Sequence, residues 1–138
     1  MDRFKTLQIV WLALMGGVVV FATMAYVLLT VAGSEMGGLP PGVLRVAAPA
    51  SVLVMAAGLL VRRKLLEAIP ASVQGDARMA RYHGAVLVGL AMIEGAGLFI
   101  IALSIASGTS NWIPAGTAVT ILMMAIARPR RSEIEAAS

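Results

Sequence analysis

The residue best suited to chemistry in this sequence is Glu94, which lies in the stretch GLAMIEGAGLF from Gly89 to Phe99. It is a single carboxylic acid among apolar and small residues. A charged group in the middle of an apolar helix is costly, and acids at such positions are typical of ion pathways or of polar contacts between helices. Two interpretations follow: Glu94 carries a proton or cation, or it is a neutral group that bonds to a neighbouring helix.

Hydroxyl groups are the polar partners that the sequence offers to Glu94. No basic residue is expected near it inside the apolar segments, so burial favours the neutral acid. The hydroxyl-bearing residues expected at a similar depth are Ser51, Thr117 and Thr120. We predict that Glu94 points inward and is hydrogen-bonded, with Thr120 or Ser51 as the favoured partner, while the ion-carrying interpretation stays open.

Four apolar segments must position these residues. The chain is 59% apolar and 13% charged, whereas a soluble domain averages about 45–50% and about 25%. The segments cover residues 7–32, 44–61, 84–106 and 112–127. A membrane-crossing helix needs roughly 17–25 residues, so the first three qualify by length and the fourth is short. We expect an all-α, integral membrane four-helix bundle, with residues 1–138 as one domain and 128–138 as a basic cytoplasmic tail.

The basic residues predict the orientation of the chain in a membrane. Ten of the eleven Lys and Arg residues fall on one side of a four-span arrangement, and only Arg45 falls on the other. Because Lys and Arg concentrate on the cytoplasmic side, we expect both termini and the loop 62–83 there, in a multi-pass protein of the cytoplasmic (inner) membrane. The segment 7–32 is longer than the about 7–15 residues of a signal-peptide core, so we expect it to be retained as a span.

Small residues near Glu94 predict close contacts between helices, because they allow helix backbones to approach. The predicted packing positions are Gly89, Ala91, Gly95, Gly97, Gly16 and Gly17. The stretch LALMGGVVVF (12–21) also aligns with LAMIEGAGLF (90–99), which places Gly16 where Glu94 stands. One interpretation is a duplicated helical hairpin; the other is the general similarity of apolar helices.

One segment, residues 63–103, resembles the polar loop and the carboxylate-bearing helix of the proteolipid subunit c of rotary ATP synthases. The matching positions are Lys64, Leu66, Glu67, Ala68 and Ile69, followed by Gly89, Ala91, Glu94 and Phe99. The resemblance implies that Glu94 is the ion-carrying carboxylate and that the chain assembles in rings. The sequence departs from the family in its two additional spans and in the lack of a glycine repeat in the segment 44–61.

Other kinds of chemistry have little support. There is no cysteine and only one histidine, His83, so a thiolate or histidine-cluster metal site is excluded. The Ser and Thr residues have no base partner for nucleophilic catalysis. We expect no enzyme activity, no metal, no cofactor and no nucleic acid partner. The predicted function is that of a subunit or accessory component that acts through helix–helix contacts in a homo-oligomer or larger membrane complex. The alternative is a proton- or cation-handling proteolipid.

Overall fold

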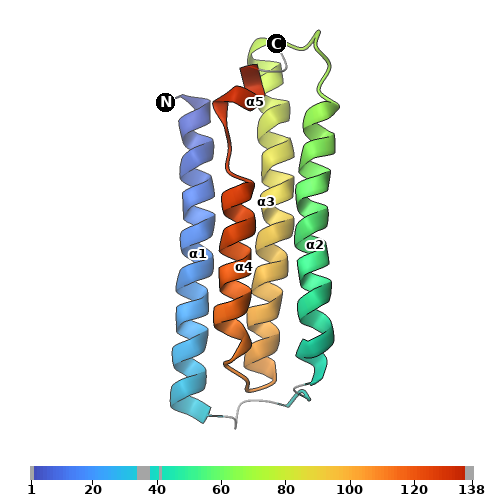
Figure 1. The fold of residues 1–138 in the computed structure, drawn as a ribbon. Coiled ribbons are helices and arrows are strands. Elements are labelled where there is room, and N and C mark those ends of the chain that lie inside the picture. Colours follow the sequence, from blue (N-terminus) through green and yellow to red (C-terminus); the bar gives the residue numbers. More distant parts are fainter. Residues whose placement is uncertain (1, 34–37, 41, 136–138) are drawn as a thin grey trace.

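The protein consists of helices that run side by side (Figure 1). The computed structural model describes residues 2–33, 38–40 and 42–135, so the end of the predicted tail, 136–138, lies outside the described residues. The helices are α1 (Arg3–Ala32), α2 (Gly42–Glu67), α3 (Gly75–Ala106), α4 (Trp112–Ile126) and the short α5 (Arg131–Glu135). No strand occurs in the described ranges, and the predicted all-α fold is confirmed.

The four predicted spans correspond to α1–α4. Three of these helices, α1, α2 and α3, are long and apolar enough to cross a membrane, whereas α4 is a shorter apolar helix of 15 residues. Both α2 and α3 continue beyond the predicted spans toward each other. The connection between them is therefore reduced to residues 68–74, and most of the predicted loop 62–83 is helical.

Successive helices alternate in direction (Figure 1). The start of α1, the α2–α3 connection and α5 lie at one end of the molecule, which we call the α5 end. In the part of the chain that the structure describes, α3 packs against α1, α2 and α4, and α4 also packs against α1 and α2. The helices α1 and α2 lie on opposite sides of the α3–α4 pair (Figure 1). The two predicted hairpins therefore differ: α3 and α4 pack directly against each other, whereas α1 and α2 are separated by that pair.

A close contact between α2 and α3 depends on two glycines. A Cβ atom added to Gly89 would lie 2.7 Å from the Cβ of Arg62 and 3.1 Å from the carbonyl oxygen of Gly58. A Cβ added to Gly58 would lie 3.0 Å from the Cβ of Met92. Because there is no space for a side chain at either position, only glycine permits this approach of the two backbones.

The contact between α3 and α4 has the same character. A side chain at Gly97 would meet Thr120, whose Cγ2 would lie 2.6 Å from the added Cβ. A Cβ on Gly116 would lie 2.9 Å from Cγ2 of Ile100. Each helix thus contributes one glycine that packs against a larger side chain of the other helix: Gly97 against Thr120, and Gly116 against Ile100. This places α3 in close contact with two neighbours.

The glycine contact predicts effects of different size for two substitutions on α3. Gly89→Ala should destabilise the fold by about 1–3 kcal/mol, because its Cβ meets atoms attached to the α2 backbone. The matched control is Gly95→Ala, where nothing lies within 4 Å of the added Cβ and the change should stay within about 0.5 kcal/mol. Midpoints of unfolding in mixed detergent micelles, followed by circular dichroism, measure both. Equal midpoints for the two variants would contradict the close contact.

Candidate functional site

Glu94 lies in a groove between α1 and α3. The groove has a volume of about 350 Å³ and is lined by Gly17, Phe21, Glu94, Leu98 and Ala102. The side chain of Glu94 is half-buried. Its carboxyl group forms no hydrogen bond and no ion pair with any residue in the described part of the chain.

Helical spacing explains the groove. Glu94, Leu98 and Ala102 follow one another at intervals of four residues, so they share one face of α3. Gly17 and Phe21 have the same spacing on α1. A Cβ on Gly17 would have nothing within 4 Å. The groove is therefore open beside Glu94 because the opposing position on α1 lacks a side chain.

The structure does not bring the three predicted hydroxyls to Glu94. The Thr120 hydroxyl donates to the carbonyl oxygen of Gly116 at 2.7 Å, within its own helix. The Thr117 hydroxyl is buried without a partner and lines a different pocket, between α1 and α4. Ser51 is buried on α2. The physical reason is the rotation of α3, which turns Gly89 toward α2 and Gly97 toward α4, but Glu94 toward α1.

The predicted packing positions divide into two groups. Gly89 and Gly97 lie at the contacts of α3 with α2 and α4. The remaining positions, Ala91, Gly95, Gly16 and Gly17, are exposed. A Cβ added to any of the three exposed glycines would have nothing within 4 Å. These four small residues therefore make no close helix contact in the described part of the chain, and one of them, Gly17, lines the groove beside Glu94. Gly58, which does pack, was not among the predicted positions.

A second polar cluster, which sequence analysis did not anticipate, joins α5 to the helices. Glu133 of α5 accepts hydrogen bonds from Nη2 of Arg62 at 2.7 Å and from the hydroxyl of Tyr82 at 2.9 Å. The Tyr82 hydroxyl in turn accepts from the backbone N–H of Arg130 at 3.0 Å. Arg62 and Tyr82 are only 8% and 2% exposed. This cluster fixes the segment that follows α4.

Further contacts hold the same segment against α1. Arg131 forms an ion pair with Asp2 at 2.9 Å and lies 5.2 Å from the centre of the Phe4 ring. Ile134 is partly buried against the core. Residues 128–135, the described part of the tail expected over 128–138, are therefore held against α1 and the helix core. The available signal was Ile134, an apolar residue in a charged tail, whose burial favours docking.

The cluster changes the ionisation of Tyr82, which lies outside the predicted spans. Burial of the side chain, together with the hydrogen bond to the Glu133 carboxylate, raises the pKa of Tyr82 to about 12. Both effects penalise the phenolate, because a buried negative charge loses water and meets a second negative charge. The cluster is therefore stable only with Tyr82 protonated.

Known proteins provide no further guide to these residues. Comparisons of the chain with protein-family models, curated proteins and solved structures found no match. Within the described residues, no group of three or more His, Cys, Asp and Glu side chains is placed to hold a metal ion. Two features are left on which to base a function: the open carboxyl of Glu94 and the docked segment at the α5 end.

The raised pKa of Tyr82 predicts a loss of stability in alkali. The folded protein holds this proton more tightly than the unfolded chain, whose tyrosine titrates near pKa 10.0. The contribution is therefore complete below pH 10 and is lost as the pH rises toward 12. Tyr82→Phe removes this component, and it should also lower stability at neutral pH by about 1–3 kcal/mol through the loss of the bonds to Glu133 and Arg130.

Denaturant midpoints measured at a series of alkaline pH values test this. The matched control is Tyr26→Phe, which removes the hydroxyl of a tyrosine that is 43% exposed and lies outside the cluster. It should lower stability at neutral pH less than Tyr82→Phe does. A wild-type curve that declines no more than the curve of Tyr82→Phe would contradict the predicted role.

Proposed function

We propose that the protein is an integral membrane protein of the cytoplasmic (inner) membrane that acts, without enzyme activity, as a subunit or accessory component through helix–helix contacts. Three helices have the length and apolarity that crossing a membrane requires. Large apolar side chains cover the outside of α1, where Val20, Met24 and Val31 are 59%, 66% and 82% exposed. Lipid accepts such a surface, whereas water does not.

Charge supports the orientation within this proposal. The basic residues other than Arg45 belong to the segments at the α5 end or beside it (Figure 1). Arg45 lies near the start of α2, at the opposite end. By the positive-inside rule, the α5 end, with both termini, faces the cytoplasm.

The observation that carries the contact function is the unpartnered carboxyl of Glu94. A carboxyl that faces lipid without a partner costs several kcal/mol, so a neighbour that hydrogen-bonds to it would be strongly favoured. The exposed Gly17 beside the groove and the exposed Ala91 and Gly95 on α3 leave space for another helix backbone. We infer that a helix of a neighbouring subunit, in a homo-oligomer or a larger membrane complex, covers this face.

The second candidate function is proton or cation handling by Glu94. It is favoured by the same open groove, because no group of the described residues competes for the carboxyl. The resemblance of residues 63–103 to the proteolipid subunit c supports the same role. In that case, the neighbouring subunit would supply the path by which the ion reaches Glu94.

Substitutions at Glu94 distinguish the two functions. For the contact function, Glu94→Gln should assemble normally, whereas Glu94→Leu should weaken assembly by about three- to tenfold, as expected for the loss of one hydrogen bond between membrane helices. The matched control is Thr30→Val, which removes an exposed hydroxyl bonded only within α1. Sedimentation in mild detergent measures the assembled fraction. Normal assembly of Glu94→Leu would contradict the contact function.

For the ion-handling function, Glu94→Gln should assemble but abolish proton movement into reconstituted vesicles, and Glu94→Asp should retain part of it. A lipid-soluble carbodiimide, which reacts with protonated carboxyls, should label Glu94 in the wild type and not in Glu94→Gln. Absence of labelling at acidic pH in the folded protein would eliminate this candidate.

Accessibility of single cysteines tests the orientation, since the chain has no native cysteine. Cysteines at the exposed positions Gln74 and Asn111 lie in the α2–α3 and α3–α4 connections. An impermeant thiol reagent added outside intact cells should label Asn111→Cys and spare Gln74→Cys, because the two connections lie at opposite ends of α3. Labelling of Gln74→Cys, or equal labelling of both, would overturn the proposed topology.

A further inference from the structure

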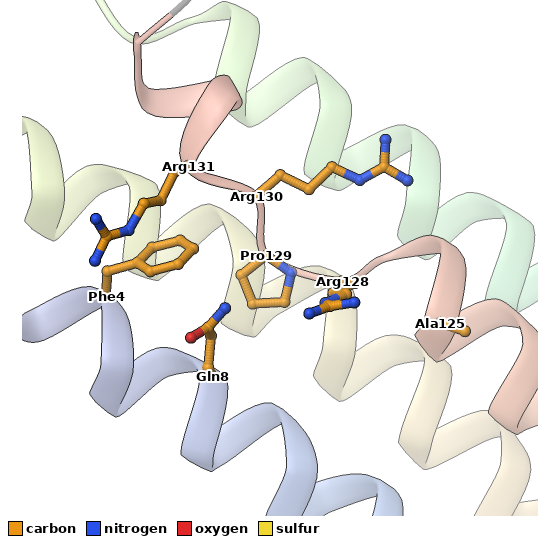
Figure 2. Close-up of a pocket in the computed structure, with 7 residues that line it drawn as sticks. All are labelled: Phe4, Gln8, Ala125, Arg128, Pro129, Arg130 and Arg131. Atoms are coloured by element: carbon orange, nitrogen blue, oxygen red, sulfur yellow. The ribbon is translucent and has the colours of Figure 1, made fainter.

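A pocket of about 460 Å³ lies at the α5 end, between α1 and the segment that follows α4 (Figure 2). It is lined by Phe4, Gln8, Ala125, Arg128, Pro129, Arg130 and Arg131. No acidic residue is among the lining residues. The pocket therefore combines positive charge and a side-chain amide with an aromatic and a small apolar wall.

The arginines differ in how much of their charge is neutralised. Arg131 is directed toward Phe4 (Figure 2) and shares its charge with Asp2. Arg128 stacks over the ring of Trp11, 5.7 Å from its centre, and forms no ion pair with any described residue. The side chain of Arg130 leads away from Phe4 and Gln8 (Figure 2). Arg128 and Arg130 thus form no ion pair with any described residue, and of these two only Arg128 is held by an aromatic ring.

Such an arrangement favours a phosphate group. A guanidinium presents parallel N–H donors that match the oxygens of a phosphate, and it is held here by a flat aromatic ring. The Gln8 amide on α1 provides a further donor at the pocket wall.

A second, separate pocket lies along the same two helices. Farther along the contact between α1 and α4 lies a pocket of about 360 Å³, lined by Val19, Ala22, Thr23, Tyr26, Ile113, Pro114, Thr117 and Ala118. The lining residues Ala118 and Ala125 are seven positions apart, and so share one face of α4 at a spacing of about 10 Å. Leu122, between them, is 59% exposed. A basic site and an apolar groove are therefore aligned along the helices.

We propose that the pocket at Arg128 binds the phosphate of an anionic phospholipid of the cytoplasmic leaflet, while an acyl chain of that lipid lies along the α1–α4 groove. A free phosphate ion would use the basic pocket but not the apolar groove, which is why the lipid is favoured. The binding site is separate from the groove of Glu94 and independent of the subunit contacts. It uses only the membrane location from the proposed function.

Trp11 provides a reporter beside the site, because Arg128, which lines the pocket, stacks over its ring. In a Trp112→Phe background it is the single tryptophan of the chain. The protein is reconstituted into phosphatidylcholine vesicles that contain increasing fractions of phosphatidylglycerol with brominated acyl chains, which quench tryptophan fluorescence. Brominated phosphatidylcholine serves as the neutral comparison. Half-maximal quenching should need about fivefold less of the anionic lipid than of the neutral one, as expected for one arginine beside a headgroup of net negative charge, whose phosphate is not offset by a choline cation.

The matched substitutions are Arg128→Gln in the pocket and Arg81→Gln on α3, since Arg81 is an exposed arginine of α3 outside the pocket lining. Arg128→Gln should remove the preference for the anionic lipid, and Arg81→Gln should leave it unchanged. Each variant is compared only with itself in the two lipids, so a change in Trp11 brightness does not affect the result. The wild-type preference tests the site even if Arg128→Gln fails to fold.

Three results would overturn the proposal. Equal quenching by the two lipids would exclude selective binding. An equal loss for Arg81→Gln and Arg128→Gln would assign the preference to general surface charge. Relief of quenching by millimolar inorganic phosphate would identify the ligand as a free phosphate. Absence of quenching by either lipid would instead overturn the membrane location, and the lipid site with it.

Discussion

The absence of side chains at Gly58 and Gly89 is the constraint on which most of the structure depends. It allows α2 and α3 to approach until the Cβ of Arg62 would lie 2.7 Å from a Cβ on Gly89. The Arg62 side chain therefore runs past α3 at the α5 end, and it meets Glu133 there. The hydroxyl of Tyr82 on α3 donates a hydrogen bond to the same carboxylate. A backbone contact between two helices thus determines where the end of the chain is docked.

The central position of α3 also explains why its carboxyl group is open. Three helices surround α3, and its two glycine contacts are already occupied by α2 and α4. The third face, which carries Glu94, meets α1 across Gly17, where no side chain fills the groove. A polar residue on the least crowded face of a central helix is available to a molecule outside the chain.

Sequence analysis could predict the helices but not which way each one faces. Hydropathy is a property of whole segments, so the number of apolar helices follows from it. The polar ends by which α2 and α3 extend beyond the predicted spans do not. Which residues touch a neighbouring helix depends on how each helix is rotated about its own axis. Gly95 and Gly97 differ by about 200° around the axis of α3, and of these two only Gly97 packs against a neighbour. For the same reason, the hydroxyls expected near Glu94 lie elsewhere. Ile134 was a signal that the tail docks, but its contacts could not be predicted, because pairs such as Asp2 with Arg131 join residues from the two ends of the sequence.

For the proposed membrane protein, the shortness of α4 has a consequence for the surrounding bilayer. Its 15 residues span about 22 Å, whereas the hydrocarbon core of a bilayer is about 30 Å thick. The backbone in the last turn of α4 and just beyond it is hydrogen-bonded at that depth. Trp11 donates to the carbonyl oxygen of Met124 at 2.8 Å, and the backbone N–H of Arg130 donates to the Tyr82 hydroxyl. Lipids beside α4 would still have to thin by several ångströms, while those beside α1 and α2 would not. The protein would therefore impose a thickness gradient around its own circumference, and it would be drawn to the thinner regions of a membrane.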